Sequence, residues 1–216
     1  MTRMQGYVQQ SSPGAASEGS EVGLKLSKAG ALVVIDFYTQ MVMEGRGFQV
    51  RMGTISVPTI GDVALTDTAA EASVDAQTGW TILPCYLNAS INLGTGTDQE
   101  FALKSVAIVA AAAGATAFAP LNLYIGGPSA ATTARAAAAG GVTVTAELAT
   151  TTRRHWSHGS PVAVGAGNEP TVLKYEPLRP PPIKGPAQFY FQAASTDAGP
   201  SYYMNLDWIE LPSATL

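Results

Sequence analysis

Strict alternation of apolar and polar residues is the strongest pattern in the chain, and it predicts strands. It is clearest over Trp80–Leu93, where one parity holds Leu83, Cys85, Leu87, Ala89, Ile91 and Leu93. A period of two places successive side chains on opposite faces of an extended strand, which a helix cannot do. The alternation resumes over Phe101–Val109 after a Gly/Thr-rich turn at 94–98. These two runs therefore predict a long antiparallel hairpin.

Shorter runs of the same kind continue along the chain. They are Leu32–Met43, Phe48–Met52, Val63–Ala76, Leu121–Ile125, Val142–Leu148, Thr171–Tyr175 and a second hairpin over 187–211. Ile55–Ile60 carries Pro58, which predicts an edge strand or a loop. Ala130–Ala139 predicts one short helix that ends at Gly140. Ala110–Ala119 fits either a helix or an extended segment, because alanine favours a helix and the flanking strands do not.

The number and spacing of these elements predict an all-β protein. About eight to ten strands are separated by turn signals, and no long helices alternate with them. We expect one antiparallel β-sandwich of jelly-roll type over residues 31–216. Residues 1–30 are rich in Gly, Ser and Gln and show neither period, so they predict a flexible or extended N-terminal arm.

Charged side chains are scarce, and this changes the picture of the surface. They make up 13% of the 216 residues, against roughly 25% in an average soluble domain. Residues 101–152 carry only Lys104, Arg135 and Glu147. One domain cannot bury so long a segment on all sides, so we expect part of it to form a permanent protein interface. The alternative is an uncharged Thr/Ser/Ala surface of the kind found on extracellular and virion β proteins.

The same numbers argue against several classes of partner. The net charge is −4, with 12 basic residues, so no direct contact with nucleic acid is expected. Cys85 is the single cysteine, which leaves no intrachain disulfide and no cysteine-rich zinc site. Apolar runs stay below the roughly 18 residues of a membrane span, so no membrane contact is expected. The first 30 residues lack the apolar core of a signal peptide, and we expect a protein made in the cytoplasm.

The segment 153–158 (RRHWSH) is the densest in chemistry-bearing side chains. Arg and Trp are typical anchors of protein interfaces, so Arg153, Arg154 and Trp156 are candidate partner contacts in an exposed loop. His155 and His158 could supply two metal ligands, which are too few for a site, and on a regular strand their rings would point to opposite faces. We therefore expect no metal.

Signals for catalysis are weak. Cys85 lies on the apolar parity of its strand and is expected to be a buried small hydrophobe. No Gly-x-Ser-x-Gly elbow is present, and the pairs Asp207/Glu210 and Asp98/Glu100 are expected to be ordinary charges rather than glycosidase carboxylates. Trp80, Tyr86, Tyr202, Tyr203 and Trp208 form a possible sugar-stacking set, although Tyr202 and Trp208 share a parity with core residues. We expect no enzyme and no cofactor.

Two stretches together carry a family resemblance. One is Gly79–Pro84 leading into the strand to Leu93, and the other is Pro180–Pro212 with its Gly185-Pro186, Phe189-Tyr190-Phe191 and Tyr202–Glu210 segments. They resemble β-sandwich structural proteins of tailed-bacteriophage virions that coat or cement the capsid shell. The resemblance covers about half of the chain and consists of strand and turn patterns. It implies a trimeric or otherwise symmetric capsid decoration protein without catalytic residues.

The function expected from this resemblance and from the low charge is structural. The chain would bind the major capsid protein at the capsid surface of a virion and associate with itself, as a homotrimer, to stabilise the shell. Three alternatives remain open: another virion component (major capsid, tail or fibre protein), a carbohydrate-binding β-sandwich module, and a β-sandwich hydrolase.

Overall fold

The computed structural model describes residues 35–54, 56–93, 98–108, 110–148, 150–160, 171–196 and 198–213. The chain divides into two compact units, residues 1–40 and residues 41–216. The one helix in the described ranges is α1 (Phe37–Met43). Asp36 caps its N-terminus, because the Asp36 Oδ1 atom accepts the Thr39 N–H at 2.9 Å. The arm predicted for residues 1–30 lies outside the described residues.

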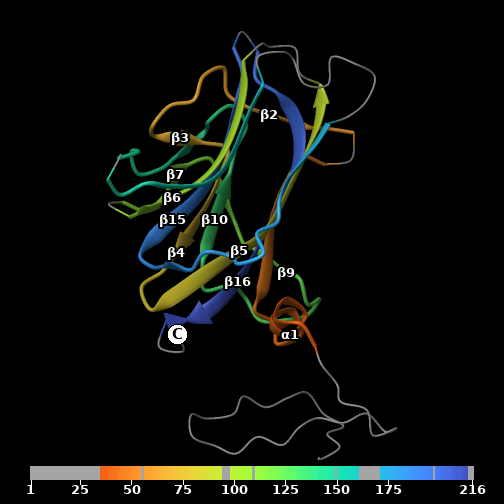
Figure 1. Cartoon of the computed structure of the whole chain (residues 1–216), viewed down its shortest axis with the longest axis vertical. Helices are drawn as coiled ribbons and strands as arrows, with labels where there is room; N and C mark the ends of the chain where they lie inside the picture. Colours follow the sequence, from red (N-terminus) through yellow and green to blue (C-terminus); the bar gives the residue numbers. More distant parts are fainter. Residues whose placement is uncertain are drawn as a thin grey trace, which may run out of the picture. The chain divides into compact units, whose positions relative to one another are not determined.

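Two antiparallel sheets dominate the second unit (Figure 1). The first sheet has the order β13 (Thr171–Tyr175), β5 (Trp80–Leu93), β16 (Ser201–Pro212), β1 (Gly47–Met52), β9 (Leu121–Asn122), with β14 (Ile183–Lys184) on β5 and β2 (Thr59–Ile60) on β16. The second has the order β12 (Arg153–Ser160), β6 (Gln99–Ala107), β15 (Ala187–Ala194), β4 (Ala72–Ala76), β10 (Thr133–Ala136), β8 (Thr116–Phe118). A small third sheet contains β3 (Ala69–Ala70), β11 (Val142–Thr143) and β7 (Ala113–Gly114).

The eight principal strands pair in a nested pattern. In chain order they are β1, β4, β5, β6, β12, β13, β15 and β16. The first pairs with the eighth, the second with the seventh, the third with the sixth and the fourth with the fifth. These pairs divide alternately between the two large sheets, where β5–β16 and β6–β15 contacts join them.

The main core lies between the two large sheets, where one parity of each strand packs against the other sheet. Tyr202 on β16 is fully buried and meets Phe101 on β6 edge-on at 6.5 Å and Phe191 on β15 at 5.7 Å. Trp208 and Phe48 fill the same layer with ring centroids 6.3 Å apart. Each buried aromatic ring removes a large apolar area from water, so these rings supply much of the stabilisation of the sandwich.

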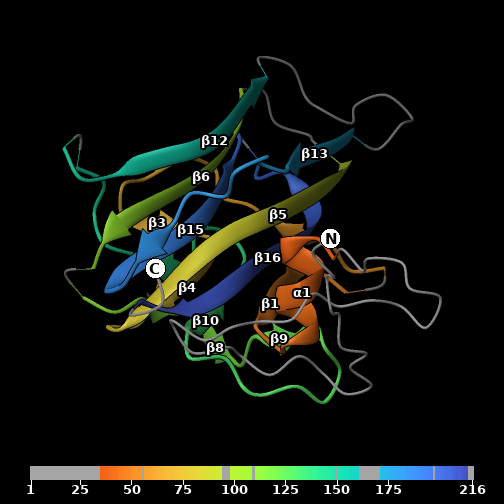
Figure 2. The same ribbon diagram turned by 60° about the horizontal axis from the view of Figure 1, so that its bottom comes forward.

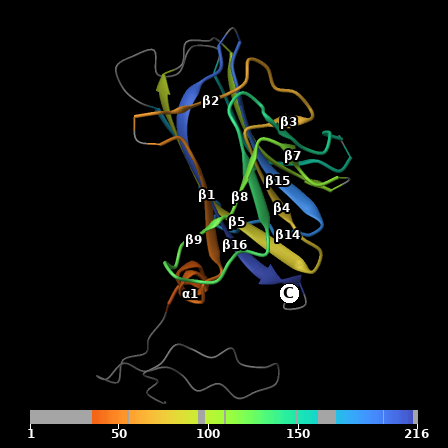
Figure 3. The same cartoon turned by 180° about the vertical axis from the view of Figure 1, so that it is seen from behind.

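The outer face of the second sheet is covered as well. A second apolar cluster joins Tyr190 and Val106 on that face to Ala70, Val142 and Val144 from the third sheet and the segment after it. This covering explains why every residue of β15 is buried, on both faces. Figure 3 shows β3 and β7 of the third sheet on the side of the second sheet that faces away from β1 and β5. The β-sandwich and its antiparallel, all-β class are as the alternation predicts.

Both predicted hairpins are wrong. β5 lies in the first sheet and β6 in the second, and β15 and β16 are separated in the same way (Figure 2). Apolar and polar residues alternate in the same way in two strands that pair as a hairpin and in two consecutive strands that lie in opposite sheets. The alternation alone therefore does not distinguish a hairpin from a connection between the sheets.

Two local predictions also need correction, and one open alternative is decided. Residues 37–43 form a helix rather than part of a strand, because the cap at Asp36 and the positive φ of Gly45 (+74°) define its two ends. The helix predicted at Ala130–Ala139 is instead the strand β10, in which Ala134 packs into the main core at 1% exposure. The segment 110–119, which fitted either a helix or an extended segment, contributes the strands β7 and β8.

Candidate functional site

The RRHWSH segment is a strand and not the predicted loop. It forms β12, the outermost strand of the second sheet, which pairs with β6. The register shifts between Arg154 and Trp156, so His155 is the extra residue of a β-bulge.

The bulge brings the two histidines to one face of the sheet. The His155 ring lies 5.8 Å from Phe189, and the His158 ring lies 6.5 Å from Phe101. Both phenylalanines belong to the main core, so both histidine rings face inward. The prediction that they point to opposite faces is wrong, because it assumed an unbroken period of two.

The three candidate partner contacts do not form a single patch. Arg153 pairs with Ser105 and lies on the inner face at the rim of the sandwich. Arg154 lies on the outer face, with its Nη2 atom 4.0 Å from the Glu147 Oε1 atom. Trp156 packs partly buried against the main core and stacks on His158 at 6.5 Å. Their role in binding a partner stays a prediction. Of the three, Arg153 also lines a cleft.

This cleft opens where the chain crosses from β14 in the first sheet to β15 in the second. Its volume is about 660 Å³. Its lining consists of Ser105, Val106, Ala107, Thr150, Thr151, Arg153, His155, Pro181, Pro182, Ile183, Lys184, Pro186 and Ala187. The crossing depends on Gly185, since a Cβ atom there would lie 2.1 Å from the Gln77 carbonyl oxygen. No larger residue fits at this position without moving the backbone.

Among the described residues of the cleft, Ser105 and His155 form the one hydrogen-bonded nucleophile–base pair. The Ser105 Oγ and His155 Nε2 atoms are 2.7 Å apart. Burial lowers the pKa of His155, and the nearby Arg153 charge lowers it further. The imidazole is therefore neutral at pH 7 and able to accept a proton. No carboxylate in the described ranges is paired with its other nitrogen, so the pair lacks the third member that orients a hydrolytic histidine.

Asp207 and Glu210, one of the two acidic pairs singled out from the sequence, have structural partners. Glu210 is 2% exposed and accepts hydrogen bonds from Trp208 Nε1 at 3.1 Å, Ala131 N at 2.8 Å and both donors of Thr132. Asp207 accepts one from Gln49 Nε2 at 2.8 Å. Both acids lie on a strand that pairs on its two sides, which makes them parts of the fold's hydrogen-bonding network rather than an open catalytic pair.

The remaining candidates of the sequence are part of the framework. Cys85 lies at a register shift between β5 and β16 and is half-buried. The prediction that it is a buried residue in a regular alternation is therefore wrong. Burial raises the pKa of the Cys85 thiol to about 12, which keeps it protonated. Tyr202 and Trp208 are fully buried, so the five aromatics do not form a sugar-stacking platform.

No group of three or more His, Cys, Asp or Glu side chains in the described ranges could hold a metal ion. No helix among the described residues is long and apolar enough to cross a membrane. No family model matches the chain, and neither a curated protein nor a solved structure matches it.

Proposed function

We propose that the chain is a non-enzymatic structural subunit of a virion, a capsid decoration protein that binds the shell as a symmetric homo-oligomer. The nested strand pairing supports a jelly roll, since a chain folded back on itself in this way produces two interleaved four-stranded sheets. Jelly rolls are common in viral capsid and lectin domains.

The scarcity of charge among the described residues of 107–151, where Arg135 and Glu147 are the two charged side chains, is the observation that carries the proposal. Arg135 donates from its Nη1 atom to the Gly114 carbonyl oxygen at 2.8 Å. Glu147 forms an ion pair with Lys104, which is 3% exposed. The charges of this stretch are thus engaged within the chain, and Ala, Gly and Thr side chains make up most of what faces outward.

Large apolar side chains are exposed on the same stretch. Ile125 is 96% exposed, Tyr124 54% and Leu148 51%. A charge-poor stretch with protruding apolar residues is typical of surface that another protein covers. A second copy and the major capsid protein are the two partners we propose for it.

Light scattering during size-exclusion chromatography tests the self-association. We expect three copies of the 22.3 kDa chain at roughly 100 µM protein. Ile125→Asp should shift the mass to that of the single chain, whereas the matched variant Leu178→Asp, at an equally exposed leucine outside the stretch, should not. A single-chain mass for the unmodified protein overturns the oligomer. Mass spectrometry of purified particles tests the virion assignment, which fails when the chain is missing from them.

A further inference from the structure

Positive charge enters the cleft from both sides of the sandwich. Arg153 pairs in register with Ser105 of the second sheet, and Lys184 pairs with Thr81 of the first. Neither cation forms an ion pair with any residue of the described ranges. Among the described residues, the cleft lining contains no Asp or Glu, although the whole chain has 16 acidic and 12 basic residues. The cleft is therefore a local cationic site in an acidic protein.

The rest of the lining is divided between neutral polar groups and an apolar wall. Ser105, His155 and the threonines at 150 and 151 supply hydrogen-bonding atoms. Pro181, Pro182 and Ala187 supply apolar surface on the crossing segment. A volume of about 660 Å³ falls within the range of small-molecule sites, which combine apolar walls with a few polar groups.

We propose that this cleft binds a small organic acid through Arg153 and Lys184. The carboxylate lies between the two cations, and the guanidinium of Arg153 offers it paired N–H donors. The apolar body of the acid packs against Pro181, Pro182 and Ala187. An inorganic anion would leave that wall exposed to water, so the wall favours an organic ligand over phosphate.

His155 reports on occupancy because it lines the cleft and His158 does not. Among the described residues, the charged groups of the cleft are Arg153, on the same strand as His155, and Lys184, on the opposite side. Burial and the charge of Arg153 disfavour the imidazolium and lower the pKa of His155. A bound carboxylate beside the two cations stabilises the imidazolium, which raises the pKa of His155. The chain has two histidines, so two ring signals cover the whole protein.

The experiment is an NMR titration of the full chain with sodium phenylacetate at constant ionic strength. The two histidine Cε1–H signals are assigned with His158→Gln. We expect the His155 signal to shift with a dissociation constant in roughly the millimolar range, with the His158 signal unchanged. Neutral phenylacetamide and inorganic phosphate should each bind at least about tenfold more weakly. The proposal fails when phosphate or the amide binds as well as phenylacetate, or when neither histidine responds.

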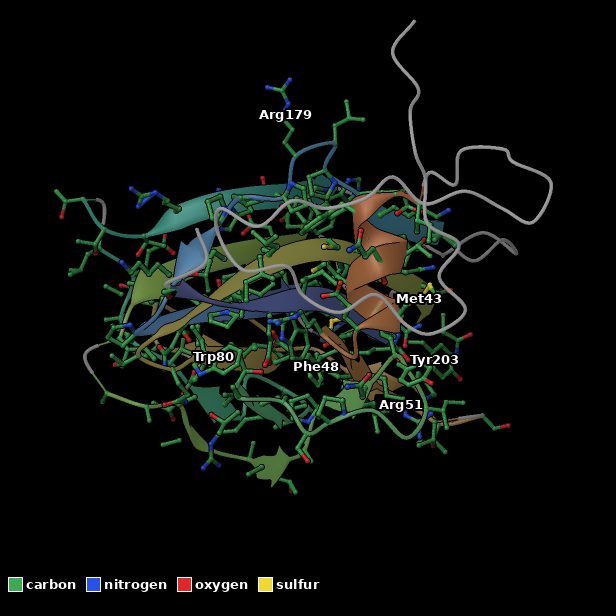
Figure 4. The ribbon with its side chains drawn as sticks, turned by 90° about the horizontal axis from the view of Figure 1, so that it is seen from below. Met43, Phe48, Arg51, Trp80, Arg179 and Tyr203 are labelled. Carbon is green, nitrogen blue, oxygen red and sulfur yellow. The ribbon has the colours of Figure 1, made fainter. Side chains whose placement is uncertain are left out.

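Substitutions of single cations locate the site. Arg153→Gln and Lys184→Gln should each weaken phenylacetate binding about tenfold or more. Arg179→Gln is the matched control, because Arg179 is exposed, projects from the surface and does not line the cleft (Figure 4). Equal affinity in all three variants overturns the proposal. Thermal unfolding of each variant shows whether the fold is kept, and both cations are exposed, so it should be.

Discussion

Replacing Glu210 with alanine should lower the stability of the sandwich by about 3 kcal/mol. The carboxylate is the acceptor for the Trp208 indole N–H and for the backbone and hydroxyl donors of Thr132. These two residues are at most 3% exposed, so truncation leaves three donors without an acceptor. Each buried donor left unpaired costs about 1–3 kcal/mol. We take the low end, because an adjoining pocket of about 310 Å³ lets water replace part of the loss.

Urea unfolding at pH 7, followed by tryptophan fluorescence, measures this loss. At fixed protein concentration the midpoint of Glu210→Ala should fall by about 1.5 M, given a urea dependence of about 2 kcal/mol per molar. Glu210→Gln keeps one acceptor oxygen but turns an amide group toward the Ala131 N–H, so it should lose about 1–2 kcal/mol. Glu176→Ala, at an exposed glutamate, should stay within about 0.5 kcal/mol. A midpoint for Glu210→Ala within about 0.3 M of this control would refute the reasoning.

Three further predictions concern other buried positions. Burial raises the pKa of Glu71 to about 8 from 4.5, so the folded state holds a proton that the unfolded chain loses, and stability should fall as the pH rises from about 4.5 to about 8. The loss of stability over this pH range is at most about 5 kcal/mol. Glu71→Gln should make stability nearly independent of pH over the same range. If the urea midpoint shifts equally between pH 5 and pH 8 in the unmodified protein and in Glu71→Gln, the prediction is contradicted. Glu147→Leu leaves the buried Lys104 ammonium without its partner and should cost about 2–3 kcal/mol in urea unfolding, because Glu147 is itself 30% exposed. Lys104→Met should cost less than Glu147→Leu, and the reverse order would show that burial of the ammonium is not the cause. Ala134→Leu should lower stability by about 1–3 kcal/mol through overpacking, whereas an unchanged thermal midpoint would place residue 134 outside the core.

The alternation of residues predicts the faces of the strands but not their neighbours. Trp80–Leu93 is a strand with the bounds that its pattern predicts. Its neighbours β13 and β16 come from residues 171–212, far along the chain, and nothing local in the sequence points to them. Strand pairing is decided by packing between segments that are distant in the sequence. A pattern read over about ten consecutive residues contains only one of the two segments, so it does not identify the partner strand.

Local composition misleads where packing overrides it. The alanines at 130–139 favour a helix, yet β10 fits between β4 and β8 because alanine side chains are small enough to pack there. The reverse holds at residues 37–43, where β-branched and aromatic residues favour a strand and the Asp36 cap favours a helix.

The cleft could be predicted only in part. Arg153 and His155 stand out in the sequence, but the β-bulge that turns His155 toward Ser105 has no clear sequence signal. Lys184 and the wall at 181–187 lie about 30 residues further along and become neighbours only through the crossing between the sheets.

The position of β16 has a consequence for how the protein is made. This strand lies in the middle of the first sheet, between β5 and β1, although it is the last strand of the described chain. During translation, β1 and β5 expose unpaired backbone edges until residues 201–212 leave the ribosome. Such edges readily add strands from other molecules. Stalled or prematurely terminated synthesis should therefore yield aggregates, and a chaperone that shields open edges should improve the soluble yield.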